Sequence, residues 1–384
     1  MSDSPVLGIT LPEAGKISYG RWEAFHHPTG NVEFLPVIIA RGRFTGPCFW
    51  LTAGIHGPEH GGPVVIYRLL TQELVDQLHG TMIAIPALNP IGLRTMERQP
   101  PILPKDPNRL WPDGKPRPAD DPDVDPPSPF EVVYERLFAE IIRTADFMID
   151  YHNSWTGSLS FSFQDRILYR EDEHSAANRA EAEGLHVLQY EMLRAYGHTI
   201  VGELPADKLI DEELHRATTA SVLYAKKIPT MTVELGTGHV PDPAILAASV
   251  AGTRNVLRWA GMLNRAPEIV SGIKIVDPGY PVRRRFAPRV DQPSIVIHLV
   301  ESGDRIQVGD PVAELRDVWG RPINGGFIHS QDDGFVIGRH HGIYYYPGES
   351  IMTIAIRNDA AMVTPYPKDY FSPEQHAVHH PDRE

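Results

Sequence analysis

The sequence has a single cysteine, Cys48, among its 384 residues. One thiol cannot form an intrachain disulfide, and so low a cysteine content is typical of proteins that fold in a reducing compartment. Cys48 lies in the apolar stretch PCFWLTAGI, where a buried and unreactive thiol is expected. The N-terminus also lacks a basic segment followed by an apolar one, so nothing predicts a signal peptide. We therefore expect a cytoplasmic protein.

Long hydrophobic runs and an excess of positive charge are missing as well. No apolar run approaches the roughly 20 residues that span a bilayer. The 36 Lys and Arg residues stand against 49 Asp and Glu, for a formal net charge of -13. Because nucleic acids and anionic membranes bind clustered positive charge, this balance argues against both as partners. The length suggests two domains and is compatible with a homo-oligomer.

Hydrophobic periodicity divides the chain into two regions. From residue 36 to about 265, short apolar runs alternate with segments of helical period, which predicts an α/β fold with a mainly parallel sheet flanked by helices. After residue 270, short β-like runs broken by Gly and Asp predict a small all-β, barrel-like domain. We expect a catalytic domain over 1–265, the β domain over 270–360 and a tail over 361–384. The stretch GDRIQVGDPVAEL resembles lipoyl/biotinyl-type barrels. The stretch ELRDVWGRP, which matches the hairpin tip of those carriers, has no lysine, so the resemblance implies the shape without the carrier function.

Residues 111–130 form a segment dense in Pro and Asp. This composition excludes helix and central strand and predicts an exposed loop. The loop is either a simple surface excursion or the rim or lid of a site.

Polar residues follow several of the predicted strands. His56 and Glu59 come after the first apolar run, Asn89 after the second, and His152 and Glu234 after two later ones. Ligands of open parallel sheets gather at the carboxyl ends of the strands. If the strands are parallel, these groups therefore converge on one rim.

Two histidines and a carboxylate with one position left open are the usual ligands of a catalytic zinc ion. His56 and Glu59 stand three residues apart on a tight loop, and a third ligand from a distant strand completes such a set. Gly57 lets the backbone fold so that both side chains face one point. His60 is the rival to Glu59, but Gly57 and Pro58 disfavour the helix that a His-x3-His pair needs. The alternative is a set of polar strand ends that bind no metal.

Glu234, in TMTVELGTG, is the candidate general base for a hydrolytic water. A metal lowers the pKa of its bound water to about 7, and a nearby carboxylate can take the proton and pass it to a leaving amine. An unpaired glutamate at the end of a buried strand would be costly elsewhere. The alternative role is a salt bridge at the edge of the core.

The stretch KDPNRLWP adds groups that suit an anionic substrate. The planar fork of Arg109 can hold a carboxylate through two hydrogen bonds, and Asn108 can add a donor. Asp106 can orient a metal-bound imidazole from behind. Upstream, Arg94 and Arg98 are weaker candidates for further positive charge at the site, because a lone arginine is usually solvated.

Taken in order, these motifs resemble the succinylglutamate desuccinylase/aspartoacylase family, which is related to the zinc carboxypeptidases. The resemblance covers roughly residues 36–260 and extends to the β domain; it is carried by His56-x-x-Glu59, NP at Asn89, DPNR ending at Arg109, DYHN around His152 and VELG around Glu234. It implies a zinc carboxypeptidase-like fold with one Zn²⁺ per subunit at His56, Glu59 and His152. It also implies that Glu234 is the general base and that Asn108 and Arg109 bind the substrate carboxylate.

The chain departs from the family pattern in two places. Family members often read Asp-Leu-Asn-Arg where this chain has a proline at position 107, which can shift the loop. Arg98 is a candidate for the second substrate arginine of aspartoacylases, although the intervening QPPILPK leaves the alignment open. The acyl specificity is therefore not carried over.

The leading hypothesis is a zinc-dependent amidohydrolase that removes the acyl group from a small anionic N-acyl amino acid. A metallocarboxypeptidase acting on short peptides would use the same centre. A non-catalytic metal- or ligand-binding protein is the alternative from another class, although such a protein would be expected to lack the base or a ligand.

Overall fold

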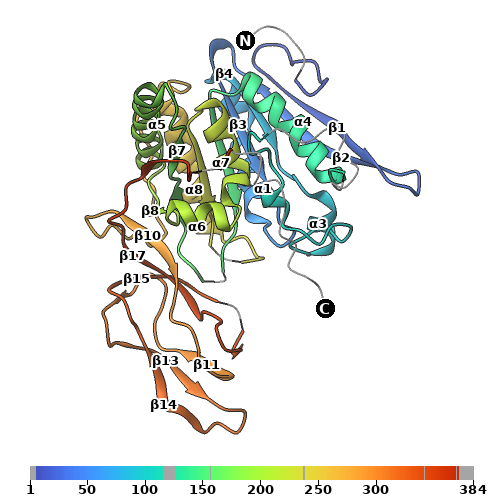
Figure 1. Ribbon diagram of the computed structural model, residues 1–384. Helices are drawn as coiled ribbons and strands as arrows, with labels where there is room; N and C mark the ends of the chain where they lie inside the picture. Colours follow the sequence, from blue (N-terminus) through green and yellow to red (C-terminus); the bar gives the residue numbers. More distant parts are fainter. Residues whose placement is uncertain are drawn as a thin grey trace.

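The structure is a computed structural model that describes residues 6–115, 126–155, 157–236, 238–340, 342–368 and 370–371. A helix-rich body lies at one end of the molecule, and the strands β11 (Ser294–His298), β13 (Pro311–Arg316) and β14 (Pro322–His329) form the other end (Figure 1). The segments 116–125, within the predicted loop, and 372–384, within the predicted tail, lie outside the described residues.

One mixed sheet runs through both parts of the molecule. Its 12 strands, in spatial order, are β1 (Lys16–His26), β2 (Val32–Arg41), β4 (His79–Ile85), β3 (Phe44–Ala53), β5 (Phe147–His152), β9 (Thr230–Glu234), β6 (Phe161–Gln164), β8 (Thr199–Gly202), β10 (Val282–Phe286), β17 (Met352–Arg357), β15 (Gly334–Arg339) and β12 (Arg305–Ile306). The central strands β4, β3, β5 and β9 are parallel, and β6 pairs antiparallel with β9.

Helices cover both faces of the part of this sheet that contains β4, β3, β5 and β9, as the predicted α/β class requires, and that prediction is confirmed. They are α1 (Gly61–Leu69), α2 (Gln72–Val75), α3 (Pro90–Thr95), α4 (Pro129–Thr144), α5 (Ser175–Tyr196), α6 (Ala206–Asp211), α7 (Thr218–Lys226) and α8 (Pro243–Trp259), with the 3-10 turns η1 (Pro107–Arg109) and η2 (Leu214–Arg216). Successive strand residues point to opposite faces, so Leu51 packs in the core under α1, α5 and α8 while Trp50 packs in the core under α4 and α7.

Local sequence signals set where these helices begin. In α4, Ser128 and Glu131 form a reciprocal capping box, and Pro129 occupies the first helical position. In α8, the Asp242 carboxylate accepts hydrogen bonds from two backbone N–H groups of the first turn. Both devices satisfy donors that a helix start leaves unpaired.

The C-terminal region is β structure, as predicted, and most of its strand pairs are antiparallel. A second sheet contains β14 (Pro322–His329), β13 (Pro311–Arg316), β11 (Ser294–His298) and β16 (Tyr344–Tyr345), and β18 (Val363–Pro365) pairs with β7 (Ile167–Tyr169). The same region also supplies β10, β17, β15 and β12 to the main sheet. The division of the chain at 265–270 stays a prediction.

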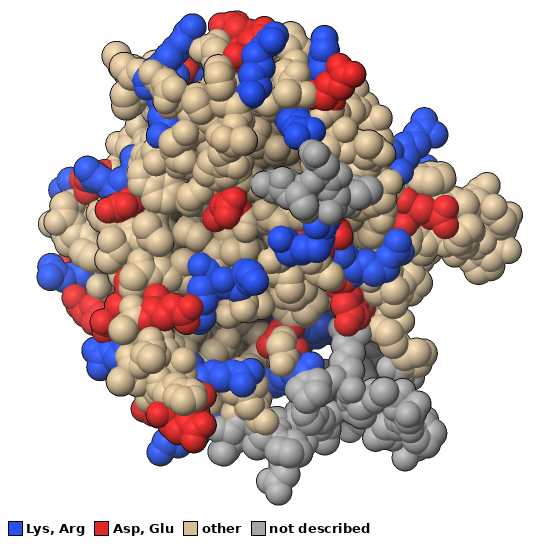
Figure 2. All heavy atoms as spheres, turned by 90° about the horizontal axis from the view of Figure 1, so that it is seen from above, with Lys and Arg blue, Asp and Glu red and all other residues tan. Residues whose placement is uncertain are grey.

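Lys and Arg side chains are interspersed with Asp and Glu on the face seen from above, with no large patch of one sign (Figure 2). Among the described helices, none combines the length and the apolar character needed to cross a membrane.

Candidate metal centre and its pocket

The loop after β3 brings His56 and Glu59 to the carboxyl end of the parallel strands. Gly57 is required there because a Cβ on it would lie 2.2 Å from two backbone carbonyl oxygens, those of Gly92 and Glu97. The Gly57 N–H donates to the Glu97 carbonyl at 3.1 Å. The glycine therefore lets the loop pack closely on the segment after α3.

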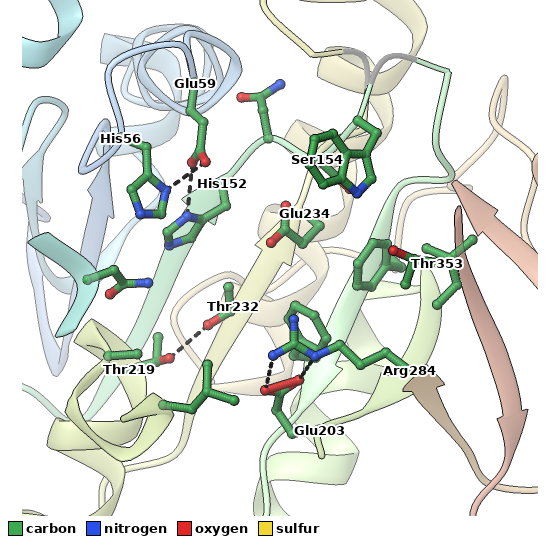
Figure 3. Close-up of a pocket in the computed structure, with 18 of the residues that line it drawn as sticks. His56, Glu59, His152, Ser154, Glu203, Thr219, Thr232, Glu234, Arg284 and Thr353 are labelled. Atoms are coloured by element: carbon green, nitrogen blue, oxygen red, sulfur yellow. Dashed lines mark hydrogen bonds and ion pairs between the residues drawn. The ribbon is translucent and has the colours of Figure 1, made fainter. Parts of the chain in front are cut away.

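Glu59 links two imidazoles from different strands. Its Oε1 lies 2.7 Å from Nδ1 of His56, and its Oε2 lies 2.9 Å from Nδ1 of His152. All three side chains are buried, and His152 is the last residue of β5. Figure 3 shows the three groups pointing toward one another. Burial alone would raise the pKa of Glu59, but His56 and His152 outweigh it and hold that pKa well below its usual range.

Each imidazole meets a second carboxylate through its other nitrogen. Nε2 of His56 lies 3.0 Å from Asp106, and Nε2 of His152 lies 2.9 Å from Asp150. Thr52 donates to Asp150 at 2.7 Å, which fixes this fully buried carboxylate. Carboxylates behind an imidazole set its tautomer and strengthen it as a ligand. Both Nδ1 atoms are therefore left to face Glu59.

These three side chains fit a divalent metal ion such as zinc. Their ligand atoms, one from each of His56, Glu59 and His152, lie within 4.8 Å of one another, and all three residues are buried. Two imidazole nitrogens and one carboxylate oxygen form a common donor set of catalytic zinc sites. His60 is not part of this group; it lies at the N-terminal boundary of α1.

Glu234 lies beside the three candidate ligands, in register with His152 on the neighbouring strand. Burial raises the pKa of Glu234 to about 7; His152 opposes this rise and Glu59 adds to it. Among the described residues, its buried Oε2 has no hydrogen-bond partner. A carboxylate in this state can exchange a proton with a group that enters the pocket.

A pocket of about 470 Å³ opens beside these residues and is also lined by Arg98, Asn108 and Arg109. Oδ1 of Asn108 accepts hydrogen bonds from the N–H and the hydroxyl of Thr218, at 2.9 and 3.0 Å. Its amide nitrogen is therefore the group that remains to donate to a substrate.

The two arginines near the metal end differ in their partners. Arg98 donates to Asp106 at 2.8 Å and lies 3.7 Å from Glu59. Arg109 donates to the backbone carbonyls of Glu212 and Asn108. Within the described part of the chain, no carboxylate lies at ion-pair distance from Arg109. The carboxylate of a ligand would supply the negative charge that pairs with this guanidinium.

Several residues in the pocket wall, and Asp150 behind His152, were not identified from the sequence. Asp150 could have been found, because it stands two residues before His152 in a strand and so shares its face. Glu203 and Arg284 carry no local signal, because Glu203 directly follows β8 and Arg284 stands 81 residues later in β10. By contrast, Asn89 caps α3 and donates to the Ile55 carbonyl, which is a structural role.

Comparisons with known proteins indicate the family. A model of the succinylglutamate desuccinylase/aspartoacylase catalytic domain matches residues 45–260. The N-alpha-acetyl-L-2,4-diaminobutyric acid deacetylase of Halomonas elongata is 22% identical over 360 residues, which cover 92% of this chain and 95% of that protein.

Solved structures share the fold. A succinylglutamate desuccinylase from a Silicibacter species matches with a TM-score of 0.70 and 20% identity, over 93% of this chain and 100% of that one. The product-bound ectoine utilization protein EutE (DoeB) from Ruegeria pomeroyi matches with a TM-score of 0.67 and 19% identity, over 88% and 95% of the two chains.

Proposed function

This chain belongs to the succinylglutamate desuccinylase/aspartoacylase family, whose members include N-acyl amino acid deacylases, and we therefore propose that it is a zinc-dependent amidohydrolase. Its reaction would cleave the amide bond of a small N-acyl amino acid into a carboxylate and a free amino acid. The observation that carries the proposal is the buried Oε2 of Glu234, without a hydrogen-bond partner among the described residues, beside the group His56, Glu59 and His152.

His56, Glu59 and His152 would hold one zinc ion per subunit. When bound, such an ion polarises a substrate carbonyl and lowers the pKa of water. Asp106 and Asp150 keep the two imidazoles in the tautomer whose Nδ1 is free to bind. These carboxylates also keep both rings oriented when no substrate is present.

Glu234 performs the proton transfers of this mechanism. Its carboxylate takes the proton of the attacking water and gives it to the departing amine nitrogen, so that the amine leaves as a neutral group. Because Glu234 ends a strand whose neighbour carries His152, its position relative to the ligand group is fixed by the sheet. Much of the expected rate enhancement is therefore positioning.

Arg109 and Asn108 hold the substrate carboxylate, and Arg98 supports Asp106. Arg109 is half-buried and faces a pocket that also contains Glu234. A carboxylate bound there would place the adjacent amide between the ligand group and the general base. The limited volume of the pocket favours a small substrate over an extended peptide.

The test is release of free amine from a panel of N-acyl amino acids and dipeptides, with zinc-loaded and chelator-stripped protein. We expect zinc-dependent cleavage of N-acyl amino acids. Cleavage of dipeptides alone would favour the carboxypeptidase, and zinc binding without any cleavage would favour a binding protein.

A further inference from the structure

The pocket continues beyond the metal end along one face of the sheet. Phe161 pairs with Glu234, and Phe163 pairs with Thr232, so each step along β6 leads farther from the general base. Alternate residues of a strand share a face, and Phe161, Phe163 and Asp165 all line the pocket. The pocket therefore extends from Glu234 past Thr232 toward Glu203 (Figure 3).

We call this extension the distal arm. It is lined by Phe161, Phe163, Asp165, Glu203, Arg284 and Phe286. Arg284 and Phe286 come from β10, so the C-terminal region closes the arm. Aromatic rings supply much of its wall: the ring of Phe161 meets that of Phe163 edge-on at 4.9 Å between centroids.

The one arginine of the distal arm is already neutralised. Nε and Nη2 of Arg284 lie 2.5 and 2.7 Å from the two carboxylate oxygens of Glu203. The guanidinium also lies over the rings of Phe163 and Phe286, at 4.9 and 5.4 Å from their centroids. An ion pair this close leaves neither charge free to hold a ligand.

Asp165 does not restore a charge to the arm. It is buried, and its Oδ2 has no hydrogen-bond partner among the described residues. Asp165 follows β6 and Glu203 follows β8, and these two strands are paired. Burial, with Glu203 adding to the effect and Arg284 opposing it, raises the pKa of Asp165 to about 8. At neutral pH this side chain is mostly the uncharged acid.

The metal end contrasts with the arm, because there the half-buried Arg109 lacks a carboxylate partner among the described residues. The pocket therefore offers one anion site and, beyond the scissile amide, an aromatic arm without net charge. Its volume of about 470 Å³ lies within the range of about 300–1,000 Å³ that is typical of sites for drug-sized ligands.

We propose that the substrate of this enzyme carries one carboxylate and, on the other side of the scissile amide or as the amino acid side chain, an uncharged apolar group of aromatic size that fills the distal arm. This inference rests on the proposed function and names its substrate class. Succinyl, aspartyl and diaminobutyryl groups would bring an unpaired charge into the arm, and the Glu203–Arg284 pair discriminates against them.

Two substrate series test the proposal on zinc-loaded protein. The first varies the side chain of N-acetyl amino acids (phenylalanine, leucine, aspartate, 2,4-diaminobutyrate), and the second varies the acyl group on glycine (benzoyl, acetyl, succinyl). We expect the aromatic substrate to exceed the charged ones in kcat/KM by at least about 100-fold in one series. A charged substrate as the best of both series, or differences below threefold throughout, would overturn the proposal.

A variant of the ion pair gives a directional test. Glu203→Gln keeps the shape of the arm but leaves the Arg284 charge unpaired. We expect kcat/KM for the succinyl or aspartyl substrate to rise at least about tenfold relative to the aromatic one. Glu301→Gln is the matched control, because Glu301 forms an exposed ion pair with Arg339 away from the pocket. An unchanged ratio in folded Glu203→Gln would contradict the role of the pair.

Two further measurements guard against failure of folding or of turnover. If Glu203→Gln does not fold, Phe286→Ala is used instead, and it should lower the aromatic preference. Calorimetric binding of N-acetylphenylalanine and N-acetylaspartate to Glu234→Gln protein separates the two proposals. Tighter binding of the aromatic ligand without any hydrolysis by the wild type would sustain the substrate class and reject the amidohydrolase. Hydrolysis by the wild type together with tighter binding of N-acetylaspartate would sustain the amidohydrolase and reject the substrate class.

Discussion

His152 and Glu234 end two adjacent parallel strands and lie in register at the same edge of the sheet. One of them completes the His–Glu–His group, and the other presents a buried carboxylate oxygen beside it. The separation between the candidate metal site and the candidate base is thus set by the hydrogen-bonded ladder of a sheet, which is stiffer than a loop.

Replacing Asp150 by Asn should weaken zinc binding by about 10–100-fold, because the side chain would no longer supply a charged partner to His152 Nε2. The Thr52 hydroxyl can still donate to the amide oxygen, so the fold should persist. Chelator competition measures the affinity. Asp207→Asn, exposed on α6, is the control and should bind zinc as the wild type does. Equal affinity in both variants would remove Asp150 from the metal site.

Arg109→Met should raise KM for an N-acyl amino acid by about 10–100-fold, with a smaller change in kcat. The reason is the loss of the guanidinium that has no carboxylate partner within the described chain. Steady-state kinetics of amine release provide both constants. Arg94→Met is the control, since the Arg94 side chain is 70% exposed. A fall in kcat at constant KM would show that Arg109 acts elsewhere in the reaction.

Asp165 should make stability depend on pH. Burial raises its folded-state pKa to about 8, above its ordinary value of 3.8. The folded chain therefore holds this proton to higher pH than the unfolded chain. Its contribution to the free energy of unfolding is fully present below pH 4. As the pH rises, this contribution declines by up to about 1.4 kcal/mol per pH unit, and the decline ends above pH 8.

Urea unfolding at pH 5, 7 and 9 tests this dependence. The Asp165→Asn variant should lose less free energy of unfolding than the wild type between pH 5 and pH 9, and Asp207→Asn should follow the wild type. Parallel curves for wild type and Asp165→Asn would mean that Asp165 ionises normally in the folded protein.

The sequence allowed much of the metal end to be predicted, because apolar strands that each end in a polar residue have few arrangements. If the strands are parallel, His56, Glu59, His152 and Glu234 must meet at one rim, and the structure brings them together. Asp106 was predicted to lie behind a ligand imidazole, and it lies 3.0 Å from His56. The functional roles of these residues remain proposals.

The distal arm could not be predicted in the same way. It depends on the antiparallel pairing of β6 with β9 and on the pairing of β10 with β8. Hydrophobic periodicity predicts strands but does not predict which distant strands pair. Arg284 lies in the region of short β-like runs that predicted a separate β domain, yet its strand β10 belongs to the main sheet. Tyr344 and Tyr346, in the same C-terminal region, are exposed and do not line the pocket.

The most direct test of the central claim compares wild-type and Glu234→Gln protein for zinc content and for amine release on the same samples. We predict one zinc ion per chain in both proteins. We also predict turnover about 10²–10⁴-fold lower in the variant, because the amide cannot accept the water proton. Equal turnover in the two proteins would contradict the role of Glu234, and turnover unaffected by complete removal of zinc would contradict the metal-dependent mechanism itself.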